Sequence, residues 1–384
     1  MLIVRLKERK EVPILGGHPW IYSGAIEDIK GDSEVGNICR VLDSRGRFVC
    51  QGFFNPYSQI SVRVLSLGKE KIDRGFFMQR IKAAIGMRAS IIHGNTNSFR
   101  IVNAEGDGIP GLFADIYSDV VVVQFLCPGI ERYRDTIIDI LHETYPDHVI
   151  HERSDDRSRH AEGLKPMSMP LYGSLSEGEI EILESDIHYL VDVKRGERTG
   201  FYLDHRGNRQ VIKSIARDRD VLDLFSYTGG FTLAALTGGA KSVVAVDSSP
   251  PALDILKRNM DLNRIPAFSW RSVRADVMGF LSQEKETYDL IICDPPPFPK
   301  EQEILEKVIR LSMKRLRPGG IMSITTSFPY TLPPDDMIKN VGRAARSTGR
   351  RAKVIARLSQ SHDFPYLPNH PQGMHLIGYL LHVE

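Results

Sequence analysis

Three aspartates in the second half of the chain stand at the ends of short apolar runs, where carboxylates can bind a polar ligand. Asp223 lies in the run 221–225, Asp247 closes the run 242–247, and Asp276 stands where a third strand is expected to end. The carboxyl ends of parallel strands meet at one edge of a doubly wound sheet, and such sheets bind nucleotide-like ligands there. We therefore expect the three carboxylates to lie around one site.

A turn of small residues and glycines follows the first of these runs. The segment Ser226-Tyr227-Thr228-Gly229-Gly230 leads into a helical pattern that begins at Phe231. A strand that passes through glycines into a helix brings backbone N–H groups and a helix N-terminus to one point. Taken by themselves, the glycines could also belong to an ordinary strand–helix connection that binds no ligand. The strand-end acids at this spacing favour a ligand site.

The type of ligand follows from what the turn lacks. It has no Gly-x-Gly-x-x-Gly spacing for a pyrophosphate, and the chain has no Gly-x-x-x-x-Gly-Lys-Ser/Thr loop for a triphosphate. The carboxylate of Asp223 suits an ammonium group rather than a phosphate. S-adenosylmethionine has an amino acid end, a ribose and an adenine, with no phosphate. The pattern therefore predicts S-adenosylmethionine as the cofactor.

Each aspartate matches one part of this cofactor. We expect Asp223 to face the ammonium group, Asp247 to accept hydrogen bonds from the ribose hydroxyls, and Asp276 to accept one from the adenine amino group. The residues that we expect to contact the cofactor are Asp223, Phe225, Ser226, Tyr227, Thr228, Gly229, Gly230, Asp247, Ser248, Asp276, Val277 and Asp294.

A proline-rich run follows the fourth expected strand and reads Asp294-Pro295-Pro296-Pro297-Phe298. Proline fixes φ and restricts the residue before it, so the run predicts a stiff rim beside the transferred methyl group. We expect Asp294 to be catalytic, and Pro295, Pro296 and Phe298 to contact a flat substrate. Asp/Asn-Pro-Pro followed by an aromatic residue is similar to a signature of enzymes that methylate nucleobases. A proline-rich surface turn is the alternative.

Composition predicts an ordinary soluble protein. Of 384 residues, 42% are hydrophobic and 26% are charged, and no stretch approaches the ~18 apolar residues of a membrane span. The first residues lack the apolar segment of a secretory signal. The four cysteines are widely scattered and form no metal-ligand pair, so we expect no metal and a reduced, cytoplasmic chain.

A net charge of only +2 means that any RNA-binding surface must come from local clusters of basic residues. The segment 339–357 carries basic residues and no acids: Lys339, Arg343, Arg346, Arg350, Arg351, Lys353 and Arg357. This segment is a candidate phosphate-binding surface, with Arg350 and Arg351 as candidate RNA contacts. A solvated helix face is the alternative.

Three segments of different pattern must position these residues. Residues 1–70 alternate short apolar runs with turn signals and are expected to form a small β domain, with Trp20 in its core. Residues 75–190 have an α+β pattern, and we expect the mixed-charge run 152–159 to be solvated surface. Residues 191–384 alternate strands and helices, which predicts a Rossmann-like α/β domain.

Six motifs occur in order along the chain: His18-Pro19-Trp20, Val102-Asn103-Ala104-Glu105-Gly106-Asp107, Arg153-Ser154-Asp155, Thr199-Gly200-Phe201-Tyr202-Leu203-Asp204, Phe225-Ser226-Tyr227-Thr228-Gly229-Gly230-Phe231 and Asp294-Pro295-Pro296. With them the chain resembles, over essentially its whole length, the PUA-domain-containing methyltransferases that make 5-methylcytosine in large-subunit ribosomal RNA. The resemblance implies an N-terminal PUA RNA-binding domain, a central α+β domain and a C-terminal class I methyltransferase domain. It also implies an RNA partner, for which Arg206 is a further candidate contact.

The chain departs from this family at the nucleophile. Methylation of C5 of a pyrimidine needs a nucleophile at C6, and the family uses a cysteine on the loop after the fifth strand. The corresponding segment 325–330 has no cysteine, and Ser327 lies nearest the expected position. A serine hydroxyl is mostly protonated without an adjacent base. Cys293 neighbours Asp294 on a strand, so its side chain is expected on the opposite face.

Several activities remain open at this point. Family inheritance favours cytosine C5, with Ser327 or another group as an unusual nucleophile. Methylation of a base nitrogen is the alternative, with Asp294 polarising an amino group and Phe298 stacking on the base. Further alternatives are a changed or lost reaction, a non-catalytic RNA-binding module of ribosome assembly, and a small-molecule methyltransferase. The target nucleotide also remains open, as does the choice between a monomer and a homodimer.

Overall fold

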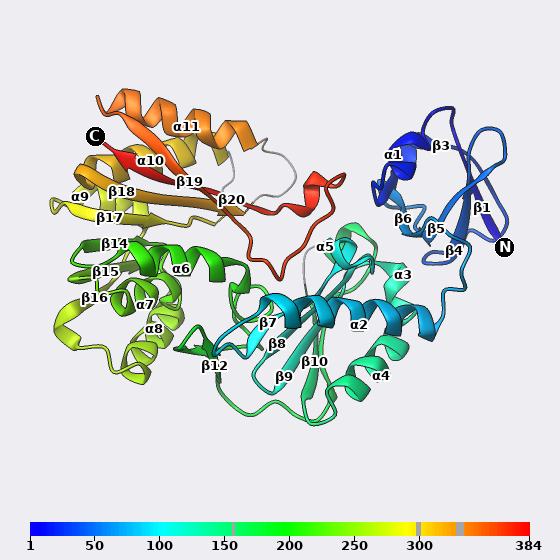
Figure 1. The fold of residues 1–384 in the computed structure, drawn as a ribbon, viewed down its shortest axis with the longest axis horizontal. Helices are drawn as coiled ribbons and strands as arrows, with labels where there is room; N and C mark the ends of the chain where they lie inside the picture. The colour runs from blue at the N-terminus through cyan, green and yellow to red at the C-terminus, as the bar shows by residue number, and fades with distance from the viewer. Residues whose placement is uncertain (156–157, 297–300, 328–333) are drawn as a thin grey trace. The chain divides into compact units, whose positions relative to one another are not determined.

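The computed structural model describes residues 1–384 apart from 156–157, 297–300 and 328–333 (Figure 1). The chain forms two compact units, each assembled from segments that are separate in sequence. The first unit contains Met1–Ile182, Val191–Phe201 and His362–Gly373. The second unit contains Leu183–Leu190, Tyr202–Ser361 and Met374–Glu384.

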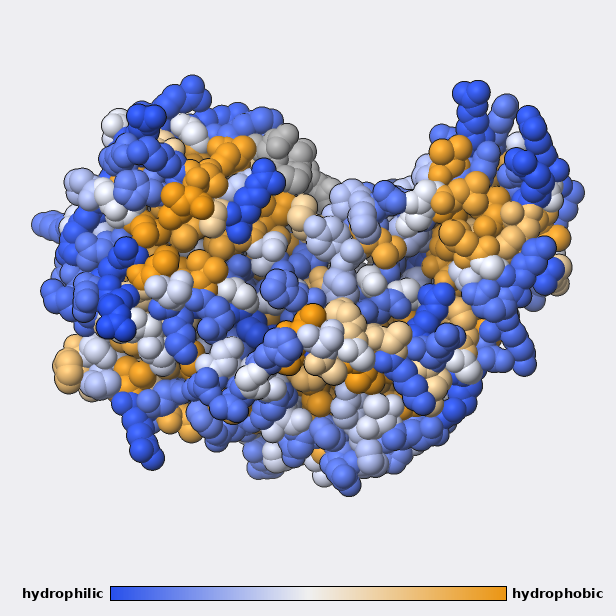
Figure 2. Space-filling model, viewed as in Figure 1, coloured by the Kyte–Doolittle hydropathy of each residue, from blue (hydrophilic) through white to orange (hydrophobic). Residues whose placement is uncertain are grey.

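A six-stranded sheet forms the N-terminal part of the first unit, in the order β2-β6-β5-β4-β1-β3. Its strands are β1 (Leu2–Leu6), β2 (Trp20–Tyr22), β3 (Ile26–Lys30), β4 (Ile38–Leu42), β5 (Phe48–Phe54) and β6 (Ile60–Ser66), and the short helix α1 (Val12–Leu15) follows β1. Trp20 is 5% exposed, which confirms its predicted place in a core. Figure 2 shows that apolar side chains also reach the surface of this β domain. Val12 and Leu15 are among its exposed apolar residues.

The second sheet of the first unit has five strands in the order β11-β10-β9-β8-β7. They are β7 (Ser98–Asn103), β8 (Leu112–Tyr117), β9 (Val120–Phe125), β10 (Val149–Ser154) and β11 (Met167–Tyr172). Helices α2 (Arg74–Ile91) and α4 (Arg134–Thr144) share an apolar core with this sheet, and α3 (Pro128–Glu131) and α5 (Ser158–Ala161) lie in its connections. The α+β pattern predicted for this part of the chain is present.

The mixed-charge run 152–159 is less solvated than its composition predicts. Glu152 is 0% exposed and Arg159 is 2% exposed, whereas Asp155 and Ser158 are exposed and 156–157 lie outside the described residues. Arg134 pairs with Glu152 at 2.7 Å, and Arg159 pairs with Glu131 at 2.8 Å. Buried charges are tolerated when they are paired. The expectation was wrong for Glu152 and Arg159, because partners from other elements neutralise their charges.

A seven-stranded sheet forms the second unit, in the order β16-β15-β14-β17-β18-β20-β19. Its strands are β14 (Asp220–Leu224), β15 (Ser242–Asp247), β16 (Trp270–Arg274), β17 (Tyr288–Cys293), β18 (Leu316–Ser327), β19 (Ala352–Ser359) and β20 (Leu376–Val383). Strands β14 to β18 pair in parallel, and β20 is antiparallel to β18 and β19. The predicted Rossmann-like arrangement is confirmed. Its strand order reverses beside β14, which places a ligand site at the carboxyl ends of β14 and β17.

Helices cover both faces of this sheet: α6 (Arg206–Ile215), α7 (Gly230–Thr237), α8 (Pro250–Leu262), α9 (Val277–Gln283), α10 (Glu301–Arg315) and α11 (Pro334–Ser347). One core joins α9, α10 and α11 to one face, and a second core joins α6 and α7 to the other, as can be followed in Figure 1. A separate two-stranded sheet consists of β12 (Ile180–Glu184) and β13 (Ile187–Val191). No helix among the described residues is long and apolar enough to cross a membrane.

The register of β14 and β17 decides which side chains face which helices. Leu222 and Cys293 belong to the core with α10, whereas Val221 and Ile292 belong to the core with α6 and α7. Side chains alternate along a strand, so Asp223 lies on the α6–α7 face of the sheet. The Asp223 carboxylate of β14 and the Cys293 thiol of β17 are therefore on opposite faces.

Candidate active site

Asp223 is a buried carboxylate just before the glycine turn. It is 1% exposed, and its Oδ2 accepts a hydrogen bond of 2.6 Å from Thr232 Oγ1 on α7. Burial is the main cause that raises the pKa of Asp223 to about 7, and the negative charges of Asp294 and Asp247 act in the same direction. A cation bound beside this carboxylate would favour its ionised form. The site therefore suits the ammonium group that the sequence predicts.

The glycine turn has an unusual backbone. Phe225 has φ of +62°, Tyr227 of +48° and Gly229 of +86°. Non-glycine residues with positive φ are uncommon and cluster at ligand sites, where surrounding contacts hold them. One such contact is the side chain of Asn259 on α8, whose Nδ2 donates to the carbonyl oxygen of Thr228 at 2.9 Å. Packing from α8 thus holds the turn in a shape that its own sequence disfavours.

Three polar side-chain atoms around the turn are buried and have no hydrogen-bond partner among the described residues. They are Asp223 Oδ1, Ser226 Oγ and Thr228 Oγ1. Leaving such atoms unpaired costs about 1–3 kcal/mol each, so they point to a polar ligand. The ammonium and carboxylate groups of a bound amino acid supply both donors and acceptors. These residues fit the methionine end of S-adenosylmethionine.

Asp247 ends β15 with both of its oxygens fixed by backbone N–H groups. Oδ2 accepts from Tyr227 N and Oδ1 from Ser249 N, each at 2.8 Å. A carboxylate offers about four lone pairs, so acceptors remain for the two hydroxyls of a ribose. Ser248, predicted beside it, is exposed. The geometry supports the ribose role and gives Asp247 a second role in holding the turn.

Asp276 and Val277 begin α9, next to the end of β16. Asp276 is exposed, and its Oδ1 accepts a hydrogen bond of 2.8 Å from Gly279 N, so it caps the helix. Val277 is buried, at 3% exposure. The position at the carboxyl end of the third parallel strand suits an adenine contact, which stays a prediction for both residues.

Asp294 follows β17, and its two oxygens lie beside different side chains. Thr325 Oγ1 on β18 donates to Oδ1 at 2.5 Å, and His205 Nε2 lies 3.2 Å from Oδ2. The Asp294 side chain is 19% exposed, whereas that of His205 is 1% exposed. Asp294 is thus an accessible carboxylate that Thr325 holds at one oxygen, and it can accept a hydrogen bond from a substrate N–H group.

Ser327 is the last residue of β18 and is partly buried. It lies two residues after Thr325, and side chains two apart on a strand point the same way, so Ser327 emerges on the side of Asp294. No base is hydrogen-bonded to Ser327 among the described residues. Its role as a nucleophile stays a prediction, without a group that would ionise the hydroxyl.

All four cysteines of the chain are buried: Cys39, Cys50, Cys127 and Cys293. Cys293 is 0% exposed in the core with α10, which confirms that it faces away from Asp294. Burial, followed by the negative charges of Asp294 and Asp223, raises the pKa of the Cys293 thiol well above its usual value. A buried thiol that resists ionisation is a poor nucleophile. None of the four thiols meets the requirement for attack on a base.

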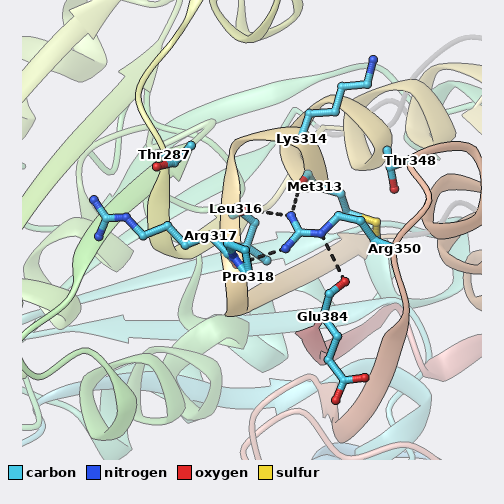
Figure 3. Close-up of a pocket in the computed structure, with 9 residues that line it drawn as sticks. All are labelled: Thr287, Met313, Lys314, Leu316, Arg317, Pro318, Thr348, Arg350 and Glu384. Atoms are coloured by element: carbon cyan, nitrogen blue, oxygen red, sulfur yellow. Dashed lines mark hydrogen bonds between the residues drawn. The ribbon is translucent and has the colours of Figure 1, made fainter.

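Arg350 has partners within the protein. Its guanidinium donates to the backbone carbonyl oxygens of Met313, Leu316, Arg317 and Glu384, as Figure 3 shows, and to a fifth, that of Val383. Arg350 and the four partners drawn in Figure 3 line a pocket of about 440 Å³ at the amino ends of β17 and β18. The carboxyl ends of the same strands carry Asp294 and Ser327, so this pocket lies at the opposite edge of the sheet. The geometry therefore argues against Arg350 as an RNA contact.

The other predicted substrate contacts have mixed positions. Arg206 begins α6, is 9% exposed and lies 3.7 Å from Glu184, so a phosphate would compete with that carboxylate. Arg351 is exposed, Pro295 is buried and Pro296 is exposed. Phe298 lies outside the described residues. The RNA contacts predicted for these residues stay predictions.

Three side chains of the site escape the sequence reasoning: Thr232, Thr325 and His205. Their contacts join separate elements, and a local pattern does not show them. The available signals were a threonine inside an apolar strand, at Thr325, and a histidine directly after the fourth motif, at His205. Within the described ranges there is no cluster of three or more side chains that could bind a metal.

Two families match the chain. Residues 4–67 match the PUA-like domain family, and residues 168–375 match the S-adenosylmethionine-dependent methyltransferase family. The second match covers more than half of the chain and contains the whole site described above.

Relatives that carry the name ribosomal RNA large subunit methyltransferase I match the chain over nearly its whole length. The relative from Alteromonas mediterranea is 36% identical over 392 residues and covers 99% of this chain and 98% of its own length. The relative from Pseudoalteromonas atlantica is 38% identical over 393 residues and covers 99% of each chain. A putative S-adenosylmethionine-dependent methyltransferase from Streptococcus mutans has the same fold over 100% of both chains, with a TM-score of 0.88 at 21% identity.

Proposed function

This chain belongs to the ribosomal RNA large subunit methyltransferase I family of S-adenosylmethionine-dependent enzymes, and on that premise we propose that it methylates a base of large-subunit ribosomal RNA. The names of its relatives and its PUA-like domain support an RNA substrate. The division into residues 1–70 for RNA binding, 75–190 as a central domain and 191–384 for methyl transfer is part of the proposal. So is a cytoplasmic location, which agrees with four free cysteines.

The atom that we propose as methyl acceptor is a base nitrogen. S-adenosylmethionine supplies a methyl group on a positively charged sulfur. When an amino nitrogen takes this group, an N–C bond forms, the S–C bond breaks, and one N–H proton must leave. The carboxylate of Asp294 can accept that N–H in a hydrogen bond and then take the proton. Asp294, held by Thr325 at 2.5 Å at the end of β17, is the observation that carries the proposal.

Cytosine C5 is the second candidate, because the resemblance stated above favours it. That reaction needs a covalent bond to C6 before the methyl transfer and the loss of the C5 proton after it. The four thiols are buried, and Ser327 has no hydrogen-bonded base among the described residues. The side chain of Ser327 nevertheless emerges on the side of Asp294. The residues present therefore favour nitrogen over C5.

Mass spectrometry of nucleosides from large-subunit RNA of cells with and without this chain tests the proposal. Loss of an N-methylated base supports it, whereas loss of 5-methylcytidine establishes C5 and requires a substitute nucleophile. An unchanged nucleoside profile overturns ribosomal RNA as the substrate.

Purified protein with labelled S-adenosylmethionine and unmodified RNA provides the second test. Asp294→Ala and Asp294→Asn should lose methyl transfer while the affinity for S-adenosylmethionine stays within about twofold, because Asp294 is proposed to act on the substrate. Turnover retained in Asp294→Ala would remove this residue from the mechanism. If the wild-type chain binds RNA but no S-adenosylmethionine, the non-catalytic module becomes the better account. Light scattering distinguishes a homodimer from a monomer.

A further inference from the structure

His205 is a buried histidine beside the proposed catalytic carboxylate. It ends the short 3-10 helix Leu203–His205 and is 1% exposed. Its Nε2 lies 3.2 Å from Asp294 Oδ2, yet the contact lacks the geometry of a hydrogen bond, and Nε2 has no other partner among the described residues. Hydrogen bonds of catalytic groups are often poorly aligned before the substrate binds. Nε2 is therefore placed to interact with Asp294 and makes no hydrogen bond to any described residue.

The contact of His205 Nδ1 with Asn208 determines which ring nitrogen of the neutral imidazole carries the hydrogen. Asn208 Nδ2 lies 3.2 Å from His205 Nδ1. An amide nitrogen only donates, so Nδ1 is the acceptor in this contact and the neutral imidazole carries its hydrogen on Nε2. The N–H group of the ring is consequently the one that faces Asp294. A buried N–H without an acceptor costs about 1–3 kcal/mol, and a turn of the Asp294 carboxylate would remove this cost.

The neighbours of His205 hold the ring in place. Its ring packs against that of Phe231 on α7, with centroids 5.3 Å apart and planes at 80°. The preceding residue, Asp204, accepts a hydrogen bond at its backbone oxygen from Ser361 N at 2.8 Å, and its Oδ2 lies 2.9 Å from His375 Nε2. A ring fixed from two sides can orient a carboxylate without losing much rotational freedom on substrate binding.

We propose that His205 is a positioning residue for methyl transfer: its Nε2–H, fixed by Asn208, donates to Asp294 Oδ2 when the base enters the site. Thr325 holds the other oxygen, and the remaining lone pairs of the carboxylate receive the amino N–H of the base. This inference rests on the proposed function, since it assigns His205 to the same carboxylate. The chain Asn208–His205–Asp294–Thr325 thereby links α6 to β18 through the reacting edge of the sheet.

The test compares His205→Leu with His205→Gln in the full chain, with RNA that the wild type methylates. A glutamine side-chain amide can place an N–H near the position of Nε2 but does not titrate. We expect His205→Leu to lower kcat about 100-fold and to change the Kd for S-adenosylmethionine less than twofold. His205→Gln should stay within about threefold of the wild-type kcat, because its amide N–H replaces the donor.

Wild-type kcat in His205→Leu would overturn the inference, and so would equal losses of kcat in His205→Leu and His205→Gln. If His205→Leu does not fold, Asn208→Ala takes its place, because it removes the group that selects the tautomer. It should lower kcat and leave the Kd for S-adenosylmethionine within about twofold, and a wild-type kcat in this variant overturns the inference. A wild type that transfers no methyl group to RNA would instead be a failure of the proposed function.

Discussion

Cys293 and Asp294 are adjacent in sequence, yet they serve opposite faces of the central sheet. Cys293 is 0% exposed in the core with α9, α10 and α11, while Asp294 contacts Thr325 and His205 at the ligand edge. The alternation of a strand produces this separation. It leaves the reacting edge with a carboxylate and without a thiol.

The first prediction is that Cys293→Ala retains methyl transfer. The thiol is buried and faces away from the substrate, so its removal should affect packing only and lower the free energy of unfolding by about 1 kcal/mol. The measurement is methyl transfer to RNA together with a urea unfolding curve. If this variant folds, binds S-adenosylmethionine and transfers no methyl group, Cys293 is a relocated nucleophile after all.

The second prediction concerns the pH dependence of stability. In the ligand-free protein the pKa of Asp223 is about 7, against an ordinary value of 3.8, so the folded state binds more protons than the unfolded state between these values. Stability from this group therefore falls as pH rises from about 4 to 7 and is constant above that. Asp223→Asn lacks the ionisable group, so it should unfold at higher temperature than the wild type at pH 8 and not at pH 4.

Cofactor binding provides the counterpart of this experiment. Saturating S-adenosylmethionine should raise the melting temperature of the wild type and have little effect on Asp223→Asn, because the variant lacks the charge that faces the ammonium group. The wild-type affinity should also weaken as pH falls below about 7. A flat affinity between pH 5.5 and 8 in calorimetry would contradict the role of Asp223.

Sequence reasoning could locate Asp223, Asp247 and Asp294 because its signals there are local. Asp247 ends an apolar run of strand length, Asp294 follows one, and Asp223 lies near the end of one. Parallel strands bring such ends together. The same holds for the glycine turn, where Gly229 adopts a positive φ of +86°. The cofactor was predictable for this reason, and the family match confirms an S-adenosylmethionine-dependent enzyme.

Contacts between distant elements could not be predicted in this way. The pairing of His205 with Asp294 depends on how the segment before α6 packs against β17, and no pattern around His205 carries that information. The position of Arg350 in the basic segment 339–357 could not be predicted for a related reason. Charge alone suggests a phosphate, but the direction of the Arg350 side chain depends on carbonyl groups from α10, β18 and β20.

The third prediction is that Asp247→Ala weakens S-adenosylmethionine binding by about 10- to 100-fold, since contacts to the ribose hydroxyls are lost. Asp247 also accepts N–H groups from Tyr227 and Ser249, so part of this loss should come from a looser turn. Asp247→Asn is the matched control, because its amide oxygen can still accept one of these N–H groups. Calorimetry should place it between the wild type and Asp247→Ala, and unchanged affinity in Asp247→Ala would rule out the ribose contact.

The fourth prediction separates two neighbouring arginines. Arg350→Gln should lower the free energy of unfolding by about 2 kcal/mol, because five carbonyl oxygens lose their donor, and should leave RNA affinity unchanged. Arg351 is exposed, so Arg351→Gln should change stability by less than about 0.5 kcal/mol. If Arg351 contacts a phosphate, the same variant should reduce the slope of log affinity against log salt by about one.

Urea unfolding and RNA titrations at several salt concentrations, with both variants side by side, check this pair. Equal RNA affinity in Arg351→Gln and the wild type would remove Arg351 from the RNA-binding surface. A stable Arg350→Gln with weakened RNA binding would contradict the structural role of Arg350, because its guanidinium could then not be held by Leu316 and Arg317. Since the two residues are adjacent and have the same charge, a difference between them must come from where each side chain points.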